Sequence, residues 1–213
     1  MVERGARPIS ECITAGAAGP RKNDHADRGD RRGRSKGLSE ERLYQSALYY
    51  LGRFAASTAS VRRVLRRRVT KYAEADGVDV DRAHGWIEAI IQRLTRSGIL
   101  DDDAYADGRA RSFFRRGFSL RMIRVKLAEK GLERSTVDRA VESLLAEHRD
   151  VDLKAALALA RRRRLGPYRQ EEKREGALKR DLSAMARAGF SFEVARLVIE
   201  APSIEALDEL DGG

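Results

Sequence analysis

The chain has 213 residues, enough for one or two ordinary domains, and 42% of them are hydrophobic, which suffices for packed cores. Its single cysteine, Cys12, excludes an intramolecular disulfide and a cysteine-based zinc site. No apolar run approaches the roughly 18 residues of a transmembrane helix, and the N-terminus lacks the apolar centre of a signal peptide. We therefore expect a soluble, cytoplasmic protein with no membrane association.

The net charge of +10 predicts an acidic partner, with nucleic acid as the leading candidate. Residues 1–38 hold nine Lys and Arg against five Asp and Glu, whereas residues 201–213 hold four acidic residues and no basic one. Residues 39–200 therefore carry a net charge of +10 by themselves. The basic character belongs to the body of the protein and is not confined to a terminal extension.

Residues 1–38 are rich in Gly, Arg, Asp and Ser and show no sustained hydrophobic periodicity. We interpret them as a disordered basic arm, because they cannot bury enough apolar surface to offset the chain entropy. A phosphate contact and a purely solubilising role both stay open for this arm. The GxxxxGK[ST] spacing of a phosphate-binding loop is absent, so ATP binding is not expected.

Residues 39–99 contain three amphipathic segments, which predict a first module of three helices. Serine or aspartate precedes each segment and can cap its N-terminus, and Gly77 ends the second. The candidate caps are Ser39, Ser57 or Ser60, and Asp79 or Asp81. The apolar stripes predict a core that includes Leu43, Phe54, Leu65, Ile87 and Leu94.

The second of these helices carries the densest basic surface in the chain. A solvated charged face and an anion-binding face are both compatible with it. Five like charges on one side, with few acidic residues nearby, favour contact with an anion. The predicted contact residues are Arg62, Arg63, Arg66, Arg67 and Lys71, with Arg121 and Arg124 as a second choice.

The three-helix pattern recurs, so residues 100–149 predict a second module and residues 150–200 a third. In the third module we expect a helix from Val151, a break at Leu165-Gly166-Pro167, and a helix over about 169–188. The predicted caps and ends are Asp101, Asp102 or Asp103, the triplet Gly117-Phe118-Ser119, Lys130-Gly131, Ser135, and the triplet Gly189-Phe190-Ser191. Residues 201–213 form an acidic tail.

No catalytic chemistry is indicated by the sequence. The run Asp101-Asp102-Asp103 lacks the spacing of a calcium loop and is explained by helix capping. The three histidines are far apart and share no metal-ligand spacing, and no pair of carboxylates stands out for acid–base work. We therefore expect no enzyme activity, no metal and no cofactor.

The order and spacing of four motifs together resemble the RecX family of bacterial recombination regulators. The resemblance spans roughly residues 40–200. The motifs are ALYYLGRF with the following S-x-x-x-V-R-R-V-L-R-R-R in residues 47–68, ILDDDAYA at 99–106, G-x-S-x-R-x-I-x-x-x-L-x-x-K-G at 117–131, and RAGFSFEVARLVI at 187–199.

The resemblance implies an all-α fold, an elongated tandem array of three three-helix modules. It also implies a regulator in DNA repair and the SOS response that binds the RecA recombinase filament on single-stranded DNA and inhibits its ATPase, growth and strand exchange. We expect a monomer, and direct contact with the single-stranded DNA stays open. Two alternatives remain: an independent helical nucleic-acid-binding protein, with base preference on bare DNA, and a protein-only structural adaptor with little affinity for DNA.

Overall fold

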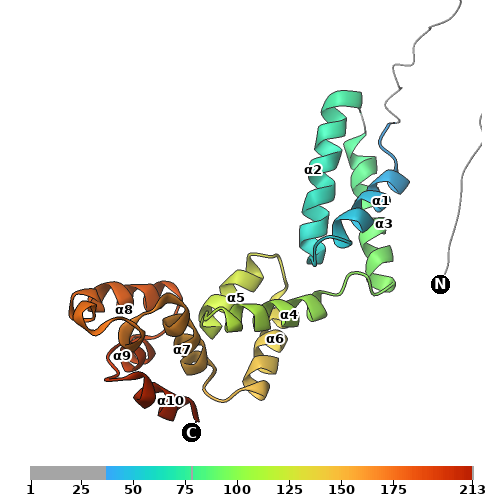
Figure 1. Ribbon diagram of the computed structural model, residues 1–213. Coiled ribbons are helices and arrows are strands. Elements are labelled where there is room, and N and C mark those ends of the chain that lie inside the picture. Colours follow the sequence, from blue (N-terminus) through green and yellow to red (C-terminus); the bar gives the residue numbers. More distant parts are fainter. Residues whose placement is uncertain (1–36, 78, 213) are drawn as a thin grey trace, which may run out of the picture. The chain divides into compact units, whose positions relative to one another are not determined.

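The computed structural model describes residues 37–77 and 79–212, and over these residues the chain is helical with no β-strand (Figure 1). The predicted arm falls almost entirely outside the described residues. Three clusters of buried apolar side chains divide the helices into three consecutive groups, which we call modules 1, 2 and 3. The predicted all-α architecture of three modules is confirmed. No helix in the described ranges is both long and apolar enough to cross a bilayer.

Module 1 comprises α1 (Glu40–Leu51), α2 (Thr58–Asp76) and α3 (Val80–Arg96). Side chains from all three helices meet in its core, where Leu43, Leu65 and Ile87 have no exposed surface. Capping residues define each helix start, because the first N–H groups of a helix have no intrahelical partner. The predicted caps are realised by Ser39, Ser57 and Asp79, whose side chains accept backbone N–H groups.

Module 2 comprises α4 (Asp102–Arg115), α5 (Leu120–Ala128) and α6 (Arg134–Glu147). Asp101 caps α4, and Ser119 caps α5 as expected. The third predicted cap is wrong, because Ser135 lies inside α6. The residue before this helix is Glu133, whose backbone is extended and whose side chain makes no capping hydrogen bond.

Module 3 comprises α7 (Val151–Arg163), three short 3₁₀ turns, α8 (Leu178–Arg187), α9 (Phe192–Ile199) and α10 (Ile204–Gly212). The 3₁₀ turn Gly166–Tyr168 lies at the predicted break. The predicted helix over 169–188 is wrong in its first half, where the 3₁₀ turns Glu171–Lys173 and Glu175–Ala177 lie instead. The Arg174 side chain donates to the carbonyl oxygens of Pro167 and Arg169. These carbonyl oxygens therefore accept hydrogen bonds from a side chain and not from the backbone N–H groups of an α-helix.

Two further expectations differ from the structure. Phe54 is 56% exposed, because α1 ends at Leu51 and the helical stripe does not continue into the loop. The acidic segment after residue 200 forms α10, and its Leu207 is fully buried in the core of module 3. Leu207, an apolar residue at the right phase, thus packs this acidic helix against the core of module 3.

Candidate interaction surface

Helix α2 has an apolar side and a basic side. Val61, Leu65 and Val69 recur every four residues and are fully buried in module 1. At about 100° per residue, the positions two further along the helix point away from that core. These positions are held by Arg63, Arg67 and Lys71, which we call the outer α2 row.

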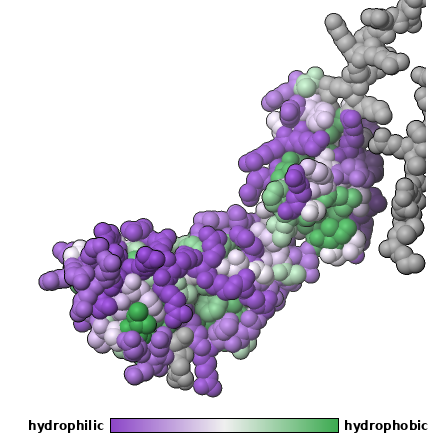
Figure 2. Space-filling view, in the orientation of Figure 1, coloured by the Kyte–Doolittle hydropathy of each residue, from purple (hydrophilic) through white to green (hydrophobic). Residues whose placement is uncertain are grey.

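The outer α2 row is available to a partner. All three side chains belong to exposed residues, and none pairs with a carboxylate within the described part of the chain. Hydrophilic residues make up most of the α2 side of module 1, with smaller hydrophobic patches between them (Figure 2). Three cations on one helical face with no compensating carboxylate create a positive field that favours an anionic partner.

The two other predicted arginines of α2 are engaged inside the module. Nε and Nη2 of Arg62 donate to the two carboxylate oxygens of Glu88 on α3, at 2.8 and 2.9 Å. Nη2 of Arg66 lies 4.0 Å from the same carboxylate. The hydrogen bond to Glu88 raises the pKa of Arg62, and the same bond lowers the pKa of Glu88. Arg62 therefore joins α2 to α3, and Arg66 lies beside the same carboxylate.

The second-choice residues lie on α5, in module 2. Arg121 is exposed and pairs with no carboxylate among the described residues. Arg124 has its Nε 3.6 Å from Oδ1 of Asp138, whose other oxygen lies 3.7 Å from Arg134. Of the seven predicted contact residues, the structure thus brings Arg62 and Arg66 together on Glu88 and leaves the outer α2 row and Arg121 outside these pairs.

A feature that the sequence did not predict is a hollow between α1 and α2. Arg68 and Tyr72 of α2 line it together with Arg42, Gln45 and Tyr49 of α1. Tyr49 is 68% exposed, and its hydroxyl accepts a hydrogen bond of 2.6 Å from Arg53. The position of Tyr49 outside the apolar stripe of α1 was the available signal, since an aromatic residue there is not needed for the core.

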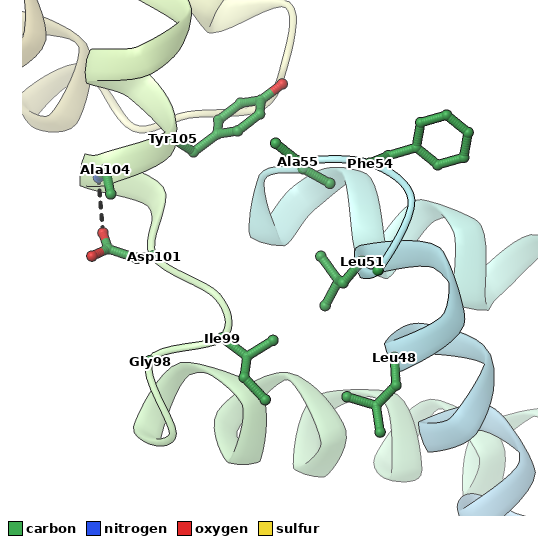
Figure 3. Close-up of a pocket in the computed structure, with 11 residues that line it drawn as sticks. Leu48, Leu51, Phe54, Ala55, Gly98, Ile99, Asp101, Ala104 and Tyr105 are labelled. Atoms are coloured by element: carbon green, nitrogen blue, oxygen red, sulfur yellow. Dashed lines mark hydrogen bonds between the residues drawn. The ribbon is translucent and has the colours of Figure 1, made fainter.

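A second hollow, of about 520 Å³, lies where the α1–α2 and α3–α4 connections approach α4. Leu51 and Ile99 point toward one another across it, and Tyr105 of α4 also lines it (Figure 3). Its lining is largely apolar and contains the carboxylate of Asp101, which accepts the Ala104 N–H. The hollow offers no pair of groups suited to acid–base chemistry.

The three consecutive aspartates have three separate structural roles. Asp101 caps α4, Asp102 accepts the N–H of Thr58, and Asp103 pairs with Arg139 at 2.5 Å. Within the residues that the structure describes, no group of three or more His, Cys, Asp or Glu side chains could hold a metal ion. The arrangement of the described residues supports binding through charge and shape.

Comparison with known proteins assigns the family. Residues 101–141 match the family model described as RecX, second three-helix domain. The protein named Regulatory protein RecX from Myxococcus xanthus is 42% identical over 176 residues, which cover 82% of this chain and 92% of that protein. The chain belongs to the RecX family. A second RecX, from Agrobacterium fabrum, is 35% identical over 165 residues, covering 78% of this chain and 85% of that protein.

A solved structure agrees with this assignment at the level of the fold. A crystal structure of regulatory protein RecX aligns with a TM-score of 0.50 and 24% identity, covering 76% of this chain and 72% of that chain. This match supports the fold alone. The predicted resemblance to RecX is confirmed by the two relatives above, and the protein is a RecX-type regulatory protein. Three surfaces are therefore candidates for contact with a partner: the outer α2 row, the hollow between α1 and α2, and the hollow beside α4.

Proposed function

We propose that this RecX-type regulator binds the RecA filament on single-stranded DNA and inhibits its ATPase, its growth and strand exchange. The observation that carries the proposal is the outer α2 row of Arg63, Arg67 and Lys71, which has no carboxylate partner among the described residues of a strongly basic protein. A nucleoprotein filament presents phosphates and acidic side chains, and both attract such a row.

Inhibition then proceeds by occupation of the filament and requires no chemistry of the regulator itself. The modules lie along the filament groove and obstruct subunit addition or closure. Tandem modules suit this role, because each presents its own exposed helices to the next part of an extended partner. The family assignment supports the regulatory role, and the unpaired cations support an anionic contact.

A second candidate is binding to bare single-stranded DNA without the recombinase. Exposed Tyr49 lies beside Arg53, whose guanidinium carbon is 5.3 Å from the ring centroid, and it lines the same hollow as Arg68. Aromatic rings next to cations are the usual means of holding unpaired bases and their phosphates. Strong binding of bare DNA, with no effect on the recombinase, would favour this candidate.

The testing experiment titrates the protein into cognate RecA on single-stranded DNA and follows the ATPase rate, with bare-DNA binding measured at the same salt. We expect inhibition well below RecA stoichiometry. When Arg63, Arg67 and Lys71 are all changed to Glu, half-maximal inhibition of the ATPase should require at least about tenfold more of the variant than of the unaltered protein. The reason is that three attractive charges become repulsive.

The matched control reverses three exposed charges of module 3, Arg163, Lys179 and Arg187, so that the total charge changes by the same amount. If this control loses as much inhibition as the α2 variant while both remain folded, net charge and not the outer α2 row governs binding. No inhibition by the unaltered protein would contradict the proposed function itself.

A further inference from the structure

Modules 1 and 2 are joined at the N-terminus of α2 by two hydrogen bonds. The Ser57 hydroxyl donates to the carbonyl oxygen of Lys130 at 2.6 Å, and the Thr58 N–H donates to Oδ1 of Asp102 at 2.8 Å. Ser57 is fully buried, and its oxygen also accepts the Ser60 N–H as the cap of α2. One serine therefore starts a helix of module 1 and binds the end of a helix of module 2.

Modules 2 and 3 are joined at the N-terminus of α5 in the same way. The Ser119 hydroxyl donates to the carbonyl oxygen of Ala188 at 3.1 Å, and the Leu120 N–H donates to Oδ1 of Asp152 at 2.8 Å. Ser119 is also fully buried, and its oxygen accepts the Met122 N–H as the cap of α5.

The two sets of contacts occupy equivalent places in the modules. In each, the serine caps the second helix of one module, and the aspartate lies in the first turn of the first helix of the next. The carbonyl that accepts the serine hydroxyl lies just after the second helix of that next module. It belongs to the residue immediately before a glycine. These glycines, Gly131 and Gly189, both have positive φ, at 76° and 91°.

We propose that these contacts are two copies of one inter-module joint, in which Ser57 with Asp102 and Ser119 with Asp152 are the positioning residues that hold successive modules in a fixed relation. The first N–H of a helix has no partner within that helix. A carboxylate from the next module supplies one here, through a charge-assisted hydrogen bond. The bond is directional and therefore specifies orientation as well as contact.

The glycines explain how the modules approach closely enough to make these bonds. A Cβ atom at Gly131 would lie 2.5 Å from Cβ of Ala59 in module 1, and one at Gly189 would lie 2.5 Å from Oγ of Ser119 in module 2. Gly77 ends α2 with a similar φ of 64°, and a Cβ there would meet nothing within 4 Å. Close approach, and not the backbone turn alone, thus requires glycine at the joints.

The joints differ in the packing beside the shared hydrogen bonds. At the second joint, a Cβ on Gly117 would lie 2.7 Å from Cβ of Leu159, and Phe114 packs on the core of module 3. Beside the first joint is the apolar hollow of about 520 Å³ (Figure 3). The first joint therefore depends more on its two hydrogen bonds, and loss of Asp102 should loosen it more than loss of Asp152 loosens the second.

The first test needs no variant. Thr58, Leu120, Glu40 and Phe192 are each the first residue of a helix whose preceding serine is the cap. Only the amides of Thr58 and Leu120 donate to an aspartate of another module. After correction for intrinsic rates, we expect these two amides to exchange at least about tenfold more slowly than those of Glu40 and Phe192.

The second test measures distances between modules with pairs of spin labels, in a background in which Cys12 is changed to serine. Labels at Thr70 and Glu142, both exposed, span the first joint, and labels at Glu142 and Lys179 span the second. Asp102→Ala should broaden the first distance distribution about twofold and leave the second unchanged. Asp152→Ala should broaden only the second, and by less.

The controls separate the joints from ordinary helix capping. Asp81→Ala removes an exposed acid from the first turn of α3, and we expect it to broaden neither distribution. Ser57→Ala should broaden the first distribution, whereas Ser191→Ala, which removes a cap bonded to the Val194 N–H, should broaden neither. Gly131→Ala should act like Ser57→Ala, and Gly77→Ala should not.

Equal exchange of the Thr58 and Phe192 amides would overturn the proposal, as would an unchanged distance distribution in folded Asp102→Ala. Neither measurement involves the recombinase, so failure of the proposed function would leave these results intact. If both proposals hold, Asp102→Ala should also weaken filament inhibition although the outer α2 row is unaltered, because that row would no longer be held in register with modules 2 and 3.

Discussion

Modules 1 and 3 are both rich in arginine, and they use it in opposite ways. In module 1, regular helices pack around an apolar core, and Arg63 and Arg67 of the outer α2 row stay outside the ion pairs of the described residues. In module 3, Arg169 binds buried Asp181, and Arg174 binds three backbone carbonyls. Arginine thus leaves an exposed basic row on α2 of one module and holds an irregular backbone segment in the other.

The difference follows from the backbone that each module must hold. Regular helices satisfy their own N–H and C=O groups, so module 1 needs side-chain partners only at helix ends. The 3₁₀ segment of module 3 leaves carbonyl oxygens that its short turns do not satisfy. Five guanidinium N–H donors in a rigid fork can serve several such oxygens at once. Local charge density therefore does not reveal which arginines are available to a partner.

The largest loss of stability is expected when Asp181 is replaced. Its side chain is 2% exposed, accepts the Gly166 N–H at 3.0 Å and accepts two hydrogen bonds from Arg169, the shorter of 2.7 Å. Asp181→Ala leaves the Arg169 charge uncompensated in a largely buried position, which should cost about 3–5 kcal/mol in the free energy of unfolding. Urea denaturation followed by circular dichroism measures it.

The control for this prediction is Asp208→Ala, which removes an exposed partner of Arg161 in the same module. A surface pair of this kind contributes at most about 1 kcal/mol. Equal losses in the two variants would contradict the view that module 3 depends on its buried ion pair.

A smaller loss of stability is expected when Arg174 is replaced. Its three nitrogen donors bind the carbonyl oxygens of Arg169, Pro202 and Pro167, at 3.2, 3.1 and 2.7 Å. Arg174→Lys keeps the charge, but one ammonium group cannot reach three divergent carbonyls, so about 2 kcal/mol should be lost. Amide exchange in α10 should also accelerate, because Pro202 precedes that helix. The exposed residue Arg187 of α8 supplies the control, and Arg187→Lys should change stability by less than about 0.5 kcal/mol.

The regular part of this architecture was predictable from sequence because its determinants are local. Apolar residues at steps of three and four locate the helices, and side chains such as Ser39, Ser57 and Asp101 mark their starts. Two of the errors lie where distant groups decide. Arg174, beside the 3₁₀ turns before α8, donates to the carbonyl oxygen of Pro202, 28 residues further along the chain, and the burial of Leu207 depends on the whole third core.

The candidate surface was predictable only in part, for the same reason. Helical phase correctly assigns the basic residues of α2 to the sides away from Val61 and Leu65. It gives no sign that Glu88, on another helix, takes up Arg62 by two hydrogen bonds. The inter-module joints were equally hidden, because the role of Ser57 depends on a carbonyl 73 residues further along the chain.

The smallest effect is expected for the Arg62–Glu88 pair, which separates the engaged arginines of α2 from the outer row. The hydrogen bond from Arg62 lowers the pKa of Glu88 from its ordinary 4.5, so the pair stabilises the fold above that pH and loses this contribution as the pH falls through the lowered pKa. Because the Glu88 side chain is 47% exposed, solvent limits the contribution to about 0.2–1 kcal/mol. Glu88→Gln should therefore be less stable than the unaltered protein at pH 7, and the difference should vanish in acid.

The fluorescence of Trp86, the single tryptophan, reports unfolding of module 1. Glu74→Gln, which removes an exposed carboxylate from α2, is the control and should show no such pH-dependent difference in stability. If the stability difference caused by Glu88→Gln were constant with pH, the hydrogen bonds between Arg62 and Glu88 would not stabilise the fold.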